Sequence, residues 1–501
     1  HDINAVAGVT AQQFGDRDQN SQGNGFSSDA TRTDNMGLAD PTKFIVTSSR
    51  QGNSLLSYLG RVNYNLLDKY LLTASLRIDG SSRFGDNNKY GIFPSFALGW
   101  KMEEEQFIKN LNLFTTLNLR ASWGRTGNQE IGNYQSMSTF GAGWKAVIGN
   151  GQVSTTTPSR LANPDLKWET SEQLNLGIDY TLLNSRISGS VDWFVKDTKD
   201  MLLSLPISRS TGFSTMMTNI GKVRNAGVEV MINTKNLTGK LNWETTLNFS
   251  CLTNEVLDLG GLNNIFSGSA GASTNVSILR VGSPMYSFFG YQIDGIWQTG
   301  DNFSVTTDNV KPGDIRYRDV DGNKAVNADD RVIIGNSFPK FNSSITNNFT
   351  YKNFNLNIFV DGVFGVDMLN NNMVDTYFPA NLKRNRLAEP LLNRWTVNNP
   401  STVYPSFVNT ATQGTKQVNT YTVEDASFIR LNTVRLGYSF KISNFNYIKG
   451  INVYVAGQNL AMITNYTGYD PSINPSGGGA RIDWNAYPSA RTFLLGLNLN
   501  L

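Results

Sequence analysis

The densest group of oxygen-bearing side chains lies in residues 319–330, which read DVDGNKAVNADD. Five of these side chains fall at positions 1, 3, 5, 9 and 12, the spacing of calcium ligands in an EF-hand-like loop. Position 6, normally a glycine at the sharp turn, is Lys324. We therefore keep two interpretations, a calcium-binding loop or an Asp- and Asn-rich turn that satisfies its own backbone. The candidate ligands are Asp319, Asp321, Asn323, Asn327 and Asp330.

A second group of candidates consists of aromatic residues in polar segments between apolar runs. Flat rings with a polar edge suit both sugar faces and peptide side chains, because they offer a large rigid area for contact. Each ring could instead pack within its own loop. The predicted substrate-binding residues are Trp144, Tyr291, Trp297, Trp395, Tyr469 and Trp484.

The scarce residues exclude several kinds of chemistry. The chain has one cysteine, Cys251, and one histidine, His1, so it lacks the ligands and bases for Cys/His zinc sites, disulfide frameworks and Ser-His-Asp catalysis. Basic and acidic residues number 43 and 40, and this balance gives no reason to expect a nucleic-acid partner. We predict that the protein is not an enzyme.

Hydrophobic residues alternate with polar ones along most of the chain, which is the pattern of β-strands with one apolar face. Tyr70, Leu72 and Leu76 share one face, for example, while Thr73 and Ser75 share the other. About fourteen such segments occur, each near the ~9–11 residues that a tilted strand needs to cross a bilayer. No apolar run reaches the ~18 residues that a spanning helix needs.

The connections between these segments alternate between short and long. Short periplasmic turns and long extracellular loops are typical of an outer-membrane barrel, whereas a compact soluble domain rarely has so many long loops. The sequence therefore predicts an all-β transmembrane antiparallel β-barrel, with Trp100, Trp123, Trp193 and Trp243 as candidates for an interfacial girdle. The short connections are 66–69, 182–185, 237–240, 351–354 and the stretch around 441–450; the long ones are 80–89, 125–167, 198–222, 253–340, 365–425 and 464–486.

The alternation starts at once, with Ile3, Ala5, Ala7 and Val9 on one face, so the chain is expected to begin inside a strand. An open sheet of about fourteen strands would leave two unpaired edges in lipid, which is costly. We therefore interpret residues 1–501 as the C-terminal part of a larger barrel whose N-terminal region supplies further strands.

Several ordered blocks resemble the C-terminal half of SusC/RagA-type, TonB-dependent outer-membrane transporters. They cover most of the chain and are together far more specific than any single motif. The blocks are RIDGSSRFGDNNKYGIFPSFALGW (77–100), ASWGRTGNQEIGNY (121–134), NPDLKWETSEQLNLGIDY (163–180), NIGKVRNAGVEVMI (219–232), PGDIRYRDVDGN from Pro312, DRVIIGNSFPKF from Asp330, ASFIRLNTVRLGYSF from Ala426 and YPSARTFLLGLNLNL from Tyr487.

This resemblance implies a barrel of about twenty-two strands in the outer membrane of a Gram-negative, Bacteroidota-like bacterium. It implies an N-terminal plug, and a TonB box that contacts the inner-membrane motor of TonB, ExbB and ExbD. It further implies a SusD-like surface lipoprotein as partner and oligosaccharides or peptides as cargo. The plug, the TonB box and a signal peptide are not among these residues.

Two other functions stay open. A non-transporting SusC-like barrel could act as a scaffold in a multiprotein outer-membrane assembly, and a passive porin or adhesin would contain no plug. The segment 366–395 could include a short helix in a long loop, more suited to packing against a partner or the rim than to chemistry; its apolar residues include Leu382, Leu387, Leu391 and Leu392.

Overall fold

The computed structural model describes residues 1–28, 30, 32, 34–149, 151–270, 273–377, 387–406, 416–441, 450–472 and 479–500. The chain divides into two compact units. Unit 1 comprises residues 1–98, 122–173 and 198–221, and unit 2 comprises residues 99–121, 174–197 and 222–501. In the part of the chain that the structure describes, no helix is both long and apolar enough to cross a membrane.

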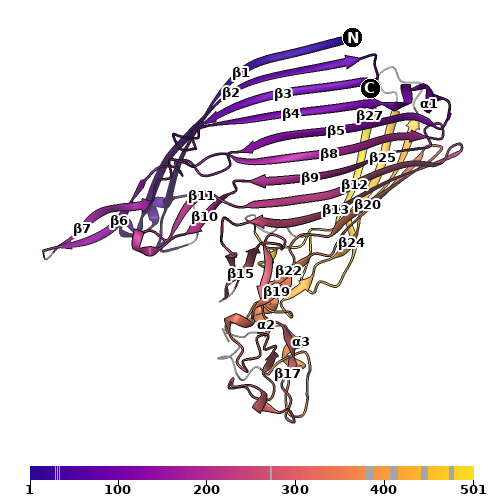
Figure 1. The fold of residues 1–501 in the computed structure, drawn as a ribbon. Helices are drawn as coiled ribbons and strands as arrows, with labels where there is room; N and C mark the ends of the chain where they lie inside the picture. The colour runs from indigo at the N-terminus through magenta and orange to yellow at the C-terminus, as the bar shows by residue number, and fades with distance from the viewer. Residues whose placement is uncertain are drawn as a thin grey trace. The chain divides into compact units, whose positions relative to one another are not determined.

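A 14-stranded sheet dominates the fold (Figure 1). Every neighbouring pair whose register is resolved is antiparallel. The predicted number of strands and the all-β class are thereby confirmed. In hydrogen-bonded order, the strands are β1 (Asp2–Gln22), β2 (Ile45–Leu66), β3 (Tyr70–Ser81), β4 (Tyr90–Lys101), β5 (Phe114–Asn128), β8 (Glu169–Leu182), β9 (Ile187–Lys199), β12 (Lys222–Leu237), β13 (Leu241–Asp258), β20 (Phe341–Tyr351), β21 (Phe354–Phe364), β24 (Phe428–Lys441), β25 (Gly450–Thr464) and β27 (Thr492–Asn500).

The first strand of unit 1 confirms that the chain begins in a strand. β1 and β2 pair without a register shift from Asp2↔Asn65 to Gln22↔Ile45. Four buried side chains form a small core in this unit, with Phe93 on β4 and Phe84, Leu166 and Trp168 in the connections. The connections also contain two ribbons, β6 (Thr139–Ile148) with β7 (Gly151–Arg160), and β10 (Leu202–Pro206) with β11 (Thr215–Asn219).

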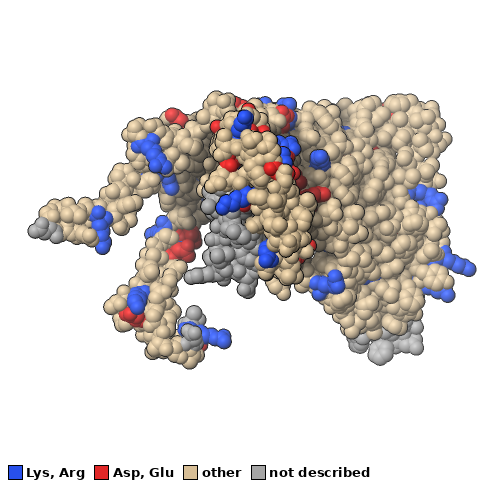
Figure 2. Space-filling model, turned by 90° about the horizontal axis from the view of Figure 1, so that it is seen from below, with Lys and Arg blue, Asp and Glu red and all other residues tan. Residues whose placement is uncertain are grey.

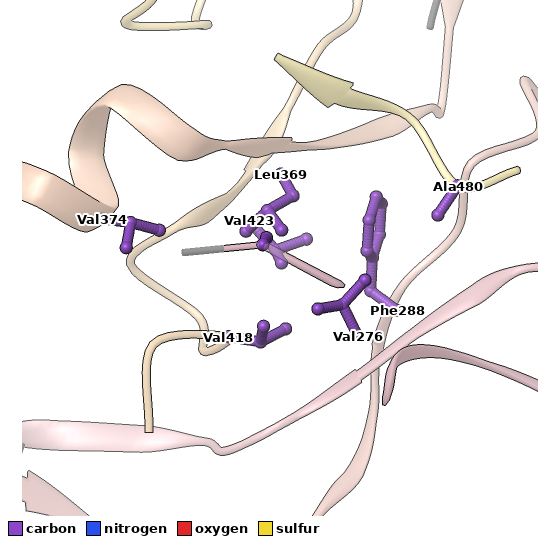
Figure 3. Packing of buried hydrophobic residues seen from close by; sticks show 8 residues of the cluster. Val276, Phe288, Leu369, Val374, Val418, Val423 and Ala480 are labelled. Atoms are coloured by element: carbon purple, nitrogen blue, oxygen red, sulfur yellow. The ribbon is translucent and has the colours of Figure 1, made fainter. Parts of the chain in front are cut away.

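The long connections of unit 2 fold against one another around a hydrophobic core. Figure 3 shows its main cluster of eight buried residues, all labelled there except Ala270. They are Ala270, Val276, Phe288, Leu369, Val374, Val418, Val423 and Ala480. The elements of these connections are β14 (Asn264–Ala270), β15 (Ser273–Arg280), β16 (Ser287–Gly290), β17 (Ile293–Ile296), β18 (Ile315–Tyr317), β19 (Val332–Gly335), β22 (Asp367–Asn370), α2 (Asn371–Tyr377), α3 (Ala388–Leu392), β23 (Val423–Asp425) and β26 (Ile482–Asp483).

The remaining short elements lie between strands. They are the helix α1 (Gln106–Lys109) and the 3-10 turns Met36–Leu38, Pro41–Lys43, Met102–Glu104, Arg209–Thr211, Phe303–Val305 and Ala328–Asp330. The helix predicted within 366–395 is present as α2 and α3. Leu387 is the N-cap of α3 and Leu391 and Leu392 lie within it, whereas Leu382 lies outside the described residues.

The short connections are tight turns, as predicted. Leu67 and Asp68 both have φ of 56° between β2 and β3, and Lys352 has φ of 53° between β20 and β21. Such left-handed residues match the twist of a two-strand connection. The long connections alternate with these turns, and the turn expected around 441–450 lies mostly outside the described residues.

Burial in this structure is inverted relative to a soluble β-sandwich. The predicted apolar stripes of the strands are exposed: Leu176 on β8 is 45% exposed and Leu495 on β27 is 78% exposed. Among the described residues, the fully buried hydrophobic side chains instead come from the connections, such as Phe288 and Leu369 at 0%, apart from Val256 near the end of β13. Exposed apolar surface of this kind marks an interaction surface, and the strands of a transmembrane barrel present such a face to lipid.

The dimensions of the strands suit a bilayer. β20 has 11 residues, or roughly 37 Å at about 3.4 Å per residue. At the ~45° tilt of barrel strands, it would cover about 26 Å, close to the ~25 Å apolar band of an outer-membrane barrel. Figure 2 shows a broad face with few charged side chains.

Of the four candidates for an interfacial girdle, Trp100 and Trp243 lie near the ends of β4 and β13, whereas Trp123 and Trp193 lie inside β5 and β9. Trp243 stacks on Phe349 with ring centroids 5.5 Å apart, near the short-turn end of β13 and β20. Trp123 stacks on Phe96 at 6.2 Å. Trp193 is 41% exposed on the apolar stripe of β9, and the indole N–H of Trp100 donates to Glu105 at 3.3 Å.

Candidate functional site

The face of the sheet opposite the apolar stripes carries ion pairs. Arg120 on β5 donates to Asp179 on β8 at 2.8 and 2.9 Å and to Asp192 on β9 at 3.1 Å. In unit 1, Arg77 donates to Asp79 at 2.8 Å and to the hydroxyl of Ser57 at 3.1 Å. This face is therefore polar and cross-linked between strands, as expected for the interior wall of a barrel.

The segment 319–330 brings its carboxylates together. Oxygen atoms of Asp319, Asp321 and Asp330 lie within 4.8 Å of one another. Lys324, at the position normally occupied by glycine, has φ of 69°. The backbone therefore makes the sharp turn of a cation loop in spite of the larger side chain, and three hard oxygen donors of the type that calcium prefers converge there.

The same carboxylates also accept hydrogen bonds from the loop backbone. Asp319 accepts from the amides of Gly322 and Lys324, both at 2.7 Å. Asp330 is fully buried and accepts from Val320 at 2.7 Å and Asn327 at 2.8 Å. The geometry is therefore compatible with both interpretations of the sequence, and the calcium assignment stays a prediction.

The electrostatics of the loop favour the ionised form of Asp319. Partial desolvation raises the pKa of Asp319, but the backbone donors of Lys324 and Gly322 lower it more, so the pKa falls below its ordinary value. A carboxylate that stays charged is the form that binds a cation.

A polar cavity of about 360 Å³ adjoins this loop within unit 2. Trp297, Tyr317 and Asp319 contribute to its wall, together with the basic residues Arg316 and Lys416. The guanidinium of Arg316 lies 4.9 Å from the ring centroid of Trp297, and the ammonium of Lys416 lies 5.1 Å from that of Tyr317. Burial lowers the pKa of Lys416, while Asp308 and Asp330 oppose this effect.

The structure separates the six predicted aromatic residues into two groups. Trp297 and Trp395 are only 5% and 8% exposed, and the indole of Trp395 donates to Gln298 at 2.9 Å. Tyr291 is also partly buried, and its ring packs against Tyr317 at 5.7 Å. These three rings belong to the packed interior of the connections in unit 2.

The other three rings are open to a ligand. Trp144 on β6 is 61% exposed, Tyr469 is 70% exposed and Trp484 is 51% exposed. The five predicted residues of unit 2 thus divide into three packed rings and two exposed ones, and Trp144 belongs to unit 1, so their role in binding stays a prediction. Sequence inspection missed the cavity cations Arg316 and Lys416, because single basic residues in a loop carry no periodic signal.

A family model for the "TonB dependent receptor-like, beta-barrel" matches residues 1–460. The chain belongs to this TonB-dependent receptor β-barrel family. The resemblance to SusC/RagA-type receptors is also confirmed by relatives. TonB-dependent receptor P3 of Formosa agariphila is 36% identical over 462 residues, covering 89% of this chain and 45% of its own length. TonB-dependent receptor SusC of Bacteroides thetaiotaomicron is 34% identical over 515 residues, covering 100% of this chain and 48% of its own length.

Solved structures of the same receptor type share the fold. The RagAB peptide importer in its open-open state superposes with a TM-score of 0.83 at 26% identity, covering 100% of this chain and 52% of that one. The RagAB peptide transporter gives a TM-score of 0.81 at 25% identity, covering 99% and 53%. This receptor chain spans about half the length of the curated relatives it matches, and its family is one of receptors and transporters, not a class of enzymes.

Proposed function

We propose that this receptor barrel imports oligomeric nutrients, oligosaccharides or peptides, across the outer membrane of a Gram-negative bacterium. The observation that carries the proposal is the inverted burial: apolar stripes such as that of β27 are exposed, while charged groups such as Arg120 and Asp179 line the opposite face. A polar wall behind a lipid-facing surface encloses an aqueous path for hydrophilic cargo.

The proposal includes energy coupling and a partner. In this scheme the region preceding residue 1 in the whole protein supplies a plug and a TonB box that contacts the motor of TonB, ExbB and ExbD. A SusD-like lipoprotein would cover the extracellular mouth, where the long connections of unit 2 form a packed assembly. Support for a two-component complex comes from the RagAB importer, whose fold this chain shares.

Transport by the whole protein tests the proposal directly. The receptor and its lipoprotein would be placed in the outer membrane of a host that lacks both, and uptake of labelled oligosaccharides and peptides would be measured. Active import is supported if uptake requires the lipoprotein and is lost in a host that lacks TonB but has an intact outer membrane. If the complex neither bound nor took up any class of oligosaccharide or peptide, the proposal of nutrient import would be wrong.

The scaffold alternative predicts a different set of partners. Purification of the whole protein in mild detergent should recover one lid lipoprotein if import is correct, and a stable set of unrelated subunits if the barrel is a scaffold. A passive porin would instead conduct solutes without TonB.

A further inference from the structure

The β1–β2 ribbon continues well past its apolar stripe. The two strands have 21 and 22 residues and an unbroken ladder, whereas about 9–11 residues suffice to cross a bilayer. On the stripe's face, the last apolar pair is Ala11↔Leu56. The register then places these pairs on the same face, in order: Gln13↔Ser54, Gly15↔Gly52 and Arg17↔Arg50.

The chain's own contacts identify which face of the extension is free. The opposite face carries Asp16 and Gln51, joined by a hydrogen bond of 3.4 Å. Asn133, from the connection after β5, accepts from Asn53 at 3.1 Å and donates to Gln51 at 3.2 Å. That face is therefore braced by unit 1 itself, and the two arginines lie on the other face, in line with the apolar stripe.

Two arginines directly opposite each other on adjacent strands repel, so such a pair is destabilising without an anion nearby. Within the described residues, no carboxylate forms an ion pair with Arg17 or Arg50. Their neighbours along the strands on that face are neutral: Gly15, Gly52, Gln19 and Ser48. Among the described residues, the Arg17–Arg50 pair is thus positively charged and has no counter-ion.

Other cation pairs at this end of the strands are bridged by the chain's own acids. In unit 1, Glu172 on β8 pairs with both Arg125 and Lys199. In unit 2, Asp197 on β9 pairs with Lys222 at 2.9 Å and Arg224 at 2.7 Å. Among the described residues, Arg17 and Arg50 have no such carboxylate, so an external anion can take the position that an acid fills elsewhere.

The height of the pair above the membrane decides what that anion is. We take the last apolar pair, Ala11↔Leu56, as the edge of the hydrocarbon. Arg17 lies six residues beyond it, which is up to about 20 Å along the strand and about 14 Å along the membrane normal at a ~45° tilt. The headgroup layer is only roughly 5–8 Å thick. The guanidinium groups therefore reach the layer of sugars above the lipid phosphates.

We propose that Arg17 and Arg50 together bind an acidic group, carboxylate or phosphate, on the core sugars of an outer-leaflet glycolipid. The planar guanidinium donates two parallel hydrogen bonds to either group, and two facing arginines can hold it from both sides. This inference rests on the outer-membrane location in the proposed function, and would fix the receptor against its surrounding lipid.

The test uses the whole protein purified in mild detergent and a defined probe, lipid A carrying two octulosonate core sugars. Binding would be measured by native mass spectrometry and by titration for the wild type, Arg17→Gln/Arg50→Gln and Arg17→Lys/Arg50→Lys. We expect the double Gln variant to lower the affinity at least tenfold. The double Lys variant should lower it less, since lysine keeps the positive charge but lacks the two parallel N–H donors of the guanidinium. Arg209→Gln/Lys145→Gln, which removes two loop cations, is the matched control and should bind like the wild type.

Two results would overturn the inference: equal affinity of the wild type and the double Gln variant, or equal affinity of the wild type for the probe and for lipid A without acidic core sugars. The second result would assign binding to the lipid phosphates. Heat-dependent mobility of the barrel on gels checks that each variant is folded. A wild-type protein that does not fractionate with outer membranes would contradict the proposed function itself, which distinguishes the two failures.

Discussion

Arg430 on β24 and Asp470 form a buried ion pair, with a nitrogen-to-oxygen distance of 2.7 Å and side chains only 10% and 5% exposed. Asp470 also accepts from the amide and hydroxyl of Ser472 at 2.9 and 2.7 Å. The pair thus joins a long strand to the connection that follows β25.

Removing one member of this pair should be costly, because it leaves an uncompensated buried charge. We expect Arg430→Met to destabilise the loop assembly by about 3–5 kcal/mol, measured by thermal unfolding and protease sensitivity in detergent. Arg318→Met is the matched control, because its pair with Asp294 is exposed and should contribute only about 0–1 kcal/mol. Similar losses of stability for Arg430→Met and Arg318→Met would contradict the conclusion that the first ion pair is buried and the second is exposed.

Adjacent residues of β13 test which face meets lipid. Leu247 pairs with Ile345 on the apolar side, and Asn248 donates to Ser344 on the other. We expect Leu247→Arg to destabilise the folded barrel by about 2–4 kcal/mol, the cost of a cation near the bilayer midplane. Asn248→Arg should be tolerated, because its side chain would reach water. Denaturant titration in lipid vesicles measures the stability of both variants. A larger loss of stability for Asn248→Arg would show that the face with Asn248, not the face with Leu247, meets lipid.

The strands could be predicted from the sequence because alternation is local. Leu174, Leu176 and Ile178 share a face whatever surrounds them, since side-chain direction in a strand repeats every two residues. The environment of loop aromatics could not be predicted. Trp144 is exposed and Trp297 is buried, yet each follows a short segment that contains glycine, and only contacts with residues distant in the sequence distinguish their environments.

The exposed and packed aromatics should respond differently to truncation. Trp144→Ala, Tyr469→Ala or Trp484→Ala should weaken cargo binding with little change in stability, if these rings contact cargo. Trp395→Ala should instead destabilise the protein by about 3–5 kcal/mol, the usual effect of removing a buried aromatic ring. Cargo affinity and thermal unfolding, measured on the same samples, separate the two effects. Unchanged affinity in all three exposed variants would remove them from the predicted binding residues.

The calcium prediction can be tested by titration. If residues 319–330 bind calcium, the affinity should be in the range of extracellular modules, a Kd on the order of 10⁻⁴–10⁻³ M. Asp321→Asn should weaken binding at least tenfold, because it removes a charged ligand but keeps the side-chain shape. Asp301→Asn, outside the candidate ligand set, serves as control. Absence of binding in calorimetry at 10-fold higher calcium than this range would leave the plain Asp/Asn turn as the interpretation.

Asp367 on β22 should make the loop assembly less stable as pH rises. Burial raises the pKa of Asp367, and the nearby Asp425 adds to this, while the amide of Asn336 opposes it. The folded state therefore binds the proton more tightly than the unfolded state, so stability falls as pH increases through the interval between the ordinary and the raised pKa. Asp367→Asn should be more stable than wild type near neutral pH and similar below the ordinary pKa.

A variant whose stability should change with pH in the opposite direction serves as the control for this prediction. The pKa of Asp319 is lowered, so its contribution is present above the ordinary pKa and is lost as the solution becomes more acidic. Asp319→Asn should thus be less stable than wild type near neutral pH, and this difference should shrink in acid. Hydrogen exchange of β22 and of residues 319–330 between pH 3.5 and 8 measures each effect locally. Parallel pH profiles for the two variants would contradict the assigned directions.

Three long connections contribute to the hydrophobic cluster around Phe288. Val276 comes from the first, Leu369 and Val418 from the second, and Ala480 from the third. If one whole loop were exchanged to change the cargo, the neighbouring loops would therefore lose the residues that they pack against. Diversification of such a receptor is expected to proceed by point changes on the outer rim, or by replacement of all three connections as a single inherited block.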